Sequence, residues 1–100
     1  MFPDKINHFV SELLRKTEQG LLKWLYDDEN SSVQVQTQEF TFSLRYNFNQ
    51  IEEVGEFVII YFSAADGKEY RFYTNQTWND YDLARRLFDT AQASGLQLPF

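Results

Sequence analysis

Apolar residues recur with helical spacing near the start of the chain. Between residues 6 and 14 they follow the pattern i, i+3, i+4, i+7 and i+8, so a helix gathers them on one face: Ile6, Phe9, Val10, Leu13 and Leu14. Asp4 is the predicted N-cap, because its carboxylate can accept hydrogen bonds from the free amides of the first turn. Gly20 is the predicted end of the helix, since glycine readily adopts the left-handed conformation that closes a helix.

A second helix is predicted near the end of the chain. Its apolar stripe consists of Trp78, Tyr81, Ala84, Leu87, Phe88 and Ala91. Two residue pairs could cap its start, Thr77 with Asp80 or Asn79 with Asp82, and Gly95 ends it. Residues 96–100 form a short apolar tail, which we expect to tuck against the body, with a loose end as the alternative.

Between the two helices the hydrophobic period changes to two, which is typical of β-strands. Alternating apolar and polar positions run through residues 21–26, 33–37, 40–48 and 69–74. The apolar positions are odd at Val33 and Val35 but even from Phe40 onward. We interpret this change of phase as a bulge or break near Gln38 and Glu39, within one strand.

Residues 57–62 are apolar at both odd and even positions, which predicts a central strand covered on both faces or nearly so. A hairpin turn is predicted at residues 65–68. The element order is therefore α-β-β-β-β-α. It predicts a single α+β domain over residues 1–100, in which an antiparallel four-stranded meander has both helices packed on one face.

The turn around Gly67 decides which side of the central strand meets solvent. A two-residue turn would pair Tyr61 with Phe72 and leave three apolar residues outside: Val58, Ile60 and Phe62. A three-residue loop would pair Ile60 with Phe72 and leave outside the other set: Phe57, Ile59 and Tyr61. We favour the second register, because it turns the more polar pair, Tyr61 and Ser63, toward solvent.

In either register the sheet face opposite the helices carries an apolar strip. The favoured register yields a candidate protein-interaction surface made of Arg45, Phe57, Ile59, Tyr61, Arg71 and Tyr73. The competing interpretation is that the tail, residues 33–37 or long polar side chains cover the strip. If the strip is open, a second copy of the chain is the simplest partner, which makes a homodimer, and a different protein is the next.

The composition narrows the classes of function. The 100 residues include nine basic and fifteen acidic side chains, and the net charge of −6 disfavours nucleic acid and anionic membranes as partners. The chain has no cysteine, which excludes disulfides, thiolate zinc sites and a cysteine nucleophile. No stretch approaches the roughly 20 apolar residues of a membrane span, and a signal-peptide pattern is missing at the start. We therefore expect a cytoplasmic protein.

Residues with catalytic or metal-binding chemistry are sparse. His8 is the single histidine, so neither a histidine metal cluster nor a catalytic triad can be built, and we interpret it as an exposed helix residue. The acidic run from Asp27 to Glu29 lacks the ligand spacing of an EF-hand, which predicts a solvated turn. The glutamates between residues 52 and 56 are interpreted in the same way. We predict no cofactor, no metal and no enzymatic activity.

The stretch from Thr17 to Trp24 contains the pattern T-x-x-G-x-L-x-W. In this pattern the chain resembles small bacterial proteins of unknown function, in which a helix runs through such a motif into an antiparallel sheet that a second helix closes. The resemblance implies that Gly20 turns the helix into the first strand, and that Leu22 and Trp24 anchor this strand on the helix. It implies no catalytic residue.

The sequence thus predicts a small acidic module that acts by protein contact. An accessory, inhibitor or immunity-type role is the specific hypothesis, because a small acidic fold can present complementary charge to a basic partner. Two alternatives stay open. A ligand-binding protein or enzyme would need a pocket between helices and sheet that uses Trp24, Tyr46 or Trp78. A mimic of nucleic-acid charge would need its loop acids to cluster: Asp27, Asp28, Glu29, Glu52, Glu53 and Glu56.

Overall fold

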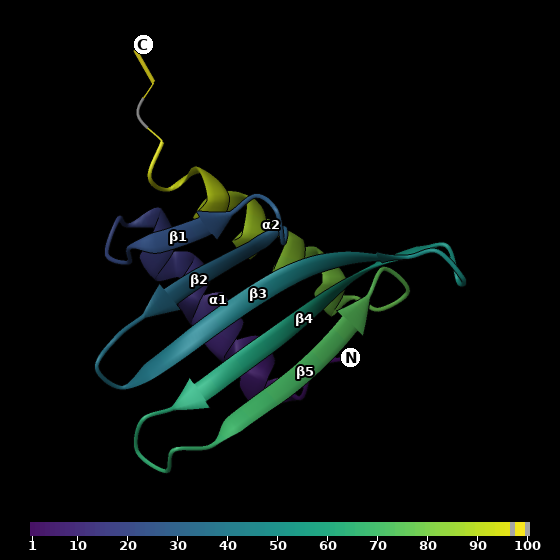
Figure 1. Ribbon diagram of the computed structural model, residues 1–100, viewed down its shortest axis with the longest axis horizontal. Helices are drawn as coiled ribbons and strands as arrows, with labels where there is room; N and C mark the ends of the chain where they lie inside the picture. Colours follow the sequence, from purple (N-terminus) through teal and green to yellow (C-terminus); the bar gives the residue numbers. More distant parts are fainter. Residues whose placement is uncertain (97, 100) are drawn as a thin grey trace.

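The computed structural model describes residues 1–96, 98 and 99. Along the chain its elements are α1 (Asp4–Glu18), β1 (Trp24–Asp27), β2 (Ser32–Gln36), β3 (Phe40–Asn49), β4 (Val54–Ser63), β5 (Glu69–Asn75) and α2 (Asp80–Ala93). The strands form one antiparallel meander in the order β1-β2-β3-β4-β5, and both helices lie on the same side of it (Figure 1). The predicted α+β class with flanking helices is confirmed. The predicted number of strands is wrong, because the sheet has five strands rather than four.

The additional strand accounts for the change of phase near residue 38. A two-residue turn joins β2 to β3, and in it the Thr37 amide donates to the Phe40 carbonyl at 2.8 Å. The Thr37 hydroxyl accepts hydrogen bonds from the amides of Glu39 and Phe40, both at 3.2 Å. Such a turn pairs odd with even positions, as in Val35 opposite Phe42. The inward side chains therefore change parity at a hairpin, and not at a bulge within one strand.

The favoured register of the last hairpin is also wrong. β5 pairs with β4 so that Ile59 lies opposite Phe72. The Ser63 amide donates to the Lys68 carbonyl at 3.0 Å, which leaves residues 64–67 in the loop, one more than expected. A shift by one residue exchanges the two faces of a strand. Three residues that were expected in solvent consequently face the helices: Phe57, Ile59 and Tyr61.

Backbone geometry determines both ends of α1. The helix begins at Asp4 with Pro3 as its N-cap, so the predicted capping role of Asp4 is wrong. Asp4 instead places a negative charge in the first turn, which the helix dipole favours. At the other end Gly20 has a φ of +74°, and its amide donates to the Thr17 carbonyl at 3.0 Å. The left-handed stop predicted at Gly20 is confirmed.

The start of α2 is bound to the start of the chain. Asn79 is the N-cap of α2 and makes no side-chain capping hydrogen bond. The buried Asp80 carboxylate accepts hydrogen bonds from the Phe2 amide, at 2.7 Å, and from the Thr74 hydroxyl. The predicted capping pairs are therefore replaced by a contact that holds Phe2 in the core, where its side chain is 2% exposed.

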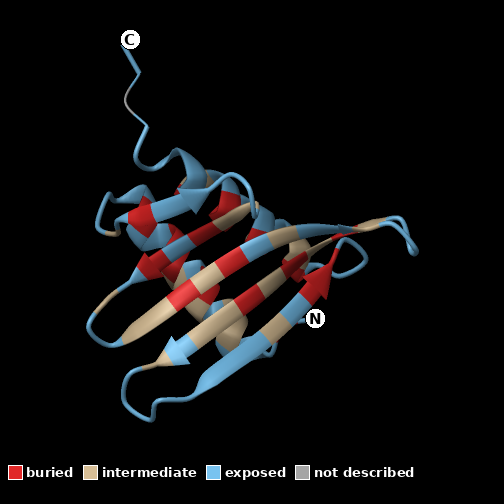
Figure 2. Ribbon diagram, viewed as in Figure 1, coloured by how far each residue is buried: buried red, intermediate tan, exposed pale blue. Residues whose placement is uncertain are grey.

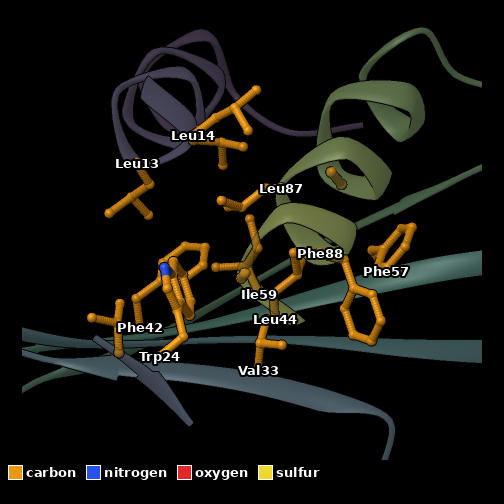
Figure 3. Packing of buried hydrophobic residues seen from close by; sticks show 14 of the residues in the cluster. Leu13, Leu14, Trp24, Val33, Phe42, Leu44, Phe57, Ile59, Leu87 and Phe88 are labelled. Carbon is orange, nitrogen blue, oxygen red and sulfur yellow. The ribbon is translucent and has the colours of Figure 1, made fainter. Parts of the chain in front are cut away.

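The hydrophobic core lies between the sheet and the helices. Figure 2 shows buried positions alternating with half-buried ones along β3 and β4. Seen from close by, α1 contributes Leu13 and Leu14, which lie above the sheet together with Leu87 and Phe88 of α2 (Figure 3). The sheet side of this core is fully buried at Val33, Phe42, Leu44 and Ile59. The strands β2, β3 and β4 therefore each have one face in the core.

β3 and β4 continue beyond the ends of their neighbours. β2 stops opposite Arg45 and β5 stops opposite Glu56, whereas the pairing of β3 with β4 continues to Asn49 and Val54. Residues 46–55 therefore form a two-stranded extension that projects from the body (Figure 1). We call this extension the β3–β4 arm.

The described residues that follow α2 lead away from the body (Figure 1). Leu96 and Leu98 are 63% and 70% exposed, so the expectation that these residues tuck against the body is wrong. Gln97 and Phe100, which belong to the predicted apolar tail, lie outside the described residues.

Candidate protein interface on the open sheet face

The candidate interface is the sheet face opposite the helices, which we call the open face. On β3, β4 and β5 it consists of Thr41, Ser43, Arg45, Asn47, Glu56, Val58, Ile60, Phe62, Glu69, Arg71, Tyr73 and Asn75. The register places Val58 between Arg45 and Tyr73 in one row of side chains. In the next row Ile60 has Arg71 as its neighbour on β5. Two arginines therefore flank an apolar strip, one on each side.

A shallow hollow lies in the middle of the open face. It has a volume of about 280 Å³ and is lined by Arg45, Asn47, Val58, Ile60 and Arg71. Val58 and Ile60 are half-buried, whereas both arginines are exposed. We call this feature the arginine hollow, since it combines apolar residues with two guanidinium groups.

The lining of the arginine hollow contains two arginines and no acid, although the open face around it also carries Glu56 and Glu69. Arg71 forms an ion pair with Glu69 through Nε at 3.3 Å, and its two terminal nitrogens donate no hydrogen bond to the described residues. Arg45 has no ion pair within residues 1–96, 98 and 99. Glu56 on the same face accepts a hydrogen bond from Asn47 at 2.7 Å. Both guanidinium groups can therefore donate to an incoming carboxylate.

The structure divides the six predicted interface residues between the two faces of the sheet. Three lie on the open face and are exposed: Arg45, Arg71 and Tyr73. The other three point toward the helices: Phe57, Ile59 and Tyr61. Ile59 is fully buried, and the Tyr61 ring packs at 5.5 Å from the ring of Phe9. The apolar residues that do line the open face are Val58, Ile60 and Phe62, the set of the register that was not favoured.

No helix or loop of the described residues covers the apolar strip, although neighbouring side chains leave Val58 and Ile60 half-buried. Figure 2 shows the open face toward the viewer, with no helix or loop of residues 1–96 crossing it. Val33 and Val35 point into the core and are 0% and 2% exposed, so residues 33–37 do not cover the strip. Phe62 and Tyr73 remain 41% and 42% exposed. The strip is therefore available to another molecule.

The tip of the β3–β4 arm carries a second distinctive surface. Ile51 is 96% exposed, and Glu52 and Glu53 beside it are exposed as well. The Asn49 side chain accepts hydrogen bonds from the amides of Ile51, at 3.0 Å, and Glu52, at 3.1 Å. Glu53 has a φ of +56°. These bonds give the tip, residues 50–53, a defined shape in which one apolar side chain is accompanied by two negative charges.

Gly55 at the root of the arm allows two tyrosines to approach the backbone. A Cβ atom at this position would lie 2.8 Å from the hydroxyl oxygen of Tyr46 and 2.9 Å from that of Tyr81. Burial raises the pKa of Tyr81, and the neighbouring Tyr46 raises it further. The close approach of Tyr81 to Gly55 packs helix α2 against the root of the arm, and this packing supports the orientation of the arm relative to the body.

The carboxylates of two other turns stabilise the turns themselves. Asp27 accepts a hydrogen bond from the side-chain amide of Asn30 at 2.6 Å, which is the main reason why the pKa of this carboxyl is lowered. Asp66 accepts from the Lys68 amide at 2.9 Å and from the Tyr70 hydroxyl, and these bonds lower its pKa. Among the residues that the structure describes, no group of three or more His, Asp or Glu is placed to hold a metal ion.

The aromatic residues considered for a ligand pocket do not converge. Trp24 is buried, Tyr46 lies over Gly55, and Trp78 is 46% exposed. The exposed His8 borders an apolar hollow of about 350 Å³ between α1 and Tyr61. The charged residues that line this hollow are Lys5 and Glu12, which lie on the same helix as His8. This hollow lacks the set of convergent polar groups that fixes a ligand in a pocket.

The acids considered for a nucleic-acid mimic fall into separate groups. Asp27, Asp28 and Glu29 lie in the turn between β1 and β2, whereas Glu52 and Glu53 lie at the tip of the arm. Figure 1 shows the arm extending well beyond the β1–β2 turn. The structure therefore does not gather these acids on one surface.

The T-x-x-G-x-L-x-W motif has structural roles in this chain. The Thr17 hydroxyl donates to the Leu13 carbonyl at 2.6 Å and accepts a hydrogen bond from Trp24 Nε1 at 2.9 Å. Gly20 supplies the left-handed turn, and Leu22 packs against the core. The motif thus joins α1 to β1 and contributes nothing to the open face.

Comparison with protein-family models, with curated proteins and with solved structures gives no match. The functional argument therefore rests on the geometry of this chain. In the described part of the chain, neither helix has the length and the apolar character needed to cross a membrane.

Proposed function

We propose that this protein acts by contact, binding another protein chain through its open face and carrying out no chemical reaction there. The observation that carries the proposal is the uncovered apolar strip of Val58, Ile60 and Phe62 between Arg45 and Arg71. Uncovered apolar surface with a polar rim is typical of interaction sites. Tyrosine and arginine, both present here, are enriched among the residues that contribute most to binding.

The sheet supports binding because it holds these side chains rigidly. Ile60 and Val58 have paired strands on both sides, so the binding surface loses little conformational entropy when a partner docks. Covering the strip removes apolar surface from water, which contributes about 25 cal/mol for each Å². The strip supplies the attraction, and the arginines select among partners.

The charges on the open face indicate the chemistry of the partner. The two guanidinium groups would be left without partners by an apolar surface and repelled by a basic one, whereas carboxylates would satisfy them. The best-matched partner therefore presents an apolar side chain flanked by acids. An accessory, inhibitor or immunity-type role is compatible with such a contact.

Photo-crosslinking from position 60 tests this function. A benzoylphenylalanine in place of Ile60 is expected to crosslink one defined protein, whereas the same group at Glu18, which is exposed on α1, is not. The identified protein is then purified and titrated by calorimetry. We expect Arg71→Glu to weaken its binding at least about tenfold and Glu18→Arg to leave it unchanged. Equal crosslinking from both positions, or none from position 60, would contradict the proposal.

A further inference from the structure

We propose that the arginine hollow receives the arm tip of a second copy of this chain, so that two copies form a dimer by exchanging their arms. The inference rests on the proposed function, because it names the partner of the same open face. It follows from the match between the arm tip and the arginine hollow, which lies further along the same two strands and on the neighbouring strand β5.

The two surfaces are complementary in polarity and in charge. The arm tip presents Ile51, which is 96% exposed, and this side chain suits the apolar residues Val58 and Ile60 of the hollow. The acids beside Ile51 are opposite in sign to the arginines beside Val58 and Ile60. An inserted tip would therefore bury its apolar side chain and place carboxylates near guanidinium groups that have free donors.

The tip of an arm cannot reach the hollow of its own chain. Arg45 and Ile51 are six positions apart along the same hairpin, and strands rise about 3.4 Å per residue, so the separation is roughly 20 Å. The intervening pairs of β3 with β4, which continue to Asn49 and Val54, keep this stretch extended. The hollow can therefore accept only an arm that comes from another molecule.

A two-fold axis between the two copies allows both hollows to be occupied at the same time. If the axis crosses the hairpin midway between hollow and tip, near the paired residues Phe48 and Gly55, each tip lies over the hollow of the other copy. The open faces then stack with the spacing of about 10 Å that is usual for packed sheets. Such an isologous contact is closed, so it produces dimers and no fibres.

The net negative charge of each copy disfavours contacts between two copies unless opposite charges are paired in the contact. Each copy carries a net charge of −6, which opposes the approach of two copies at long range. At physiological ionic strength this repulsion is screened beyond about 8 Å, whereas paired charges at the tip and the hollow are closer than that. The arm must therefore dock where the cations are, and a random contact between two copies is disfavoured.

Charge reversal at both ends of the contact tests the proposal. One variant reverses the hollow, Arg45→Glu with Arg71→Glu, and a second reverses the tip, Glu52→Arg with Glu53→Arg. The third variant combines all four changes. Two control variants reverse the same number of exposed charges elsewhere: Lys16→Glu with Arg86→Glu, and Glu18→Arg with Glu29→Arg. Sedimentation velocity over a range of concentrations measures the dimer dissociation constant of each variant, and circular dichroism verifies its fold.

We expect a dimeric wild type, a dissociation constant raised at least about tenfold in each of the first two variants, and recovery of the dimer in the combined variant. The control variants should resemble the wild type. Because Ile51 is exposed, Ile51→Asp should keep the fold and weaken the dimer, which provides a second test if a reversed variant does not fold. A wild type that stays monomeric, or a combined variant that does not recover, would overturn the proposal.

The crosslinking experiment at position 60 separates this inference from the proposed function. Crosslinks to the arm tip of another copy support both. A defined crosslink to a different protein, whose affinity depends on Arg71, supports the function and overturns arm exchange. No crosslink from position 60 overturns both.

Discussion

Thr17 connects helix α1 with strand β1 through a single hydroxyl group. The hydroxyl donates to the Leu13 carbonyl and accepts from the Trp24 indole, so it satisfies two buried polar groups that have no contact with each other. Because the whole chain of contacts is buried, water cannot replace the hydroxyl. Trp24 is also positioned for the core by this bond, which places its ring edge-to-face at 6.0 Å from Phe42.

Thr17→Val should destabilise the protein by about 1–3 kcal/mol, because the Trp24 indole N–H loses its acceptor in a buried site while the volume of the side chain is kept. Urea denaturation measures the free energy of unfolding. In a Trp24→Phe background the same change should have a smaller effect, because no donor remains to be left unpaired. Equal losses in both backgrounds would show that the hydrogen bond is not the cause.

Gly20→Val should destabilise the protein by more than about 1 kcal/mol, because a β-branched residue is strained in the left-handed conformation. The φ at Gly20 is +74°, and no other group lies within 4 Å of an added Cβ. The loss would therefore come from the backbone alone. Gly95→Val is the matched control, since this glycine also has open space around it and no positive φ. A similar loss of stability in both variants would contradict the explanation.

The strands illustrate which features of a hairpin can be predicted from the sequence. Residues 33–37 and 40–48 show their alternation plainly, and the expected face is buried at Val33, Val35, Phe42 and Leu44. The turn between β2 and β3 contains no glycine, proline or asparagine, which are the usual sequence signals of a turn. The Thr37 hydroxyl stabilises it instead, by accepting hydrogen bonds from the amides of Glu39 and Phe40. The change of phase was the available signal. Inward side chains must change parity across any hairpin that pairs odd with even positions, so such a change indicates a turn as readily as a bulge.

The root of the β3–β4 arm has no room for an added methyl group at Gly55. Gly55→Ala would place a methyl group within 3 Å of two tyrosine hydroxyls, and we expect a loss of about 1–3 kcal/mol in the free energy of unfolding. Combining it with Tyr46→Phe and Tyr81→Phe removes both hydroxyl oxygens. The penalty for Gly55→Ala should shrink in that background, as measured by thermal or chemical denaturation. An unchanged penalty would mean that the contact with the hydroxyls is not responsible.

The packing of α2 on the arm predicts a dependence of stability on alkaline pH. Burial raises the pKa of Tyr81 above its ordinary value of 10.0, so the folded state holds this proton more tightly than the unfolded chain does. The corresponding stabilisation is complete below about pH 10 and is lost as the pH rises through the pKa of the folded state. Denaturation curves between about pH 8 and pH 11 should decline less steeply for Tyr81→Phe than for the wild type. Equal slopes would refute this prediction.

For the molecule as a whole, the layers were easier to predict than the face that remains open. The apolar stripes of both helices and the two-sided apolar strand define a sheet covered on one side. The identity of the exposed side depends on one residue of loop length, because residues 57–62 are apolar at both parities and the more polar pair, Tyr61 and Ser63, indicated the wrong face. Asp66 and its hydrogen bonds to Lys68 and Tyr70 hold the longer loop. These bonds depend on the folded turn, and the sequence pattern alone does not reveal them.

Two adjacent isoleucines of β4 test the arrangement of the whole molecule. Ile59 is fully buried beneath the helices, whereas Ile60 lies in the arginine hollow. A charge at position 59 would have to enter the apolar core, so Ile59→Asp should cost more than about 3 kcal/mol and leave little folded protein. Ile60→Asp keeps its charge in contact with water, so it should retain the folded circular dichroism spectrum. The same change places a carboxylate where a partner would bury an apolar side chain, and binding at the open face should be lost. If Ile60→Asp unfolded the chain, or Ile59→Asp left it folded, the two faces would have been assigned the wrong way round, and the interface would have to be sought among Phe57, Ile59 and Tyr61 after all.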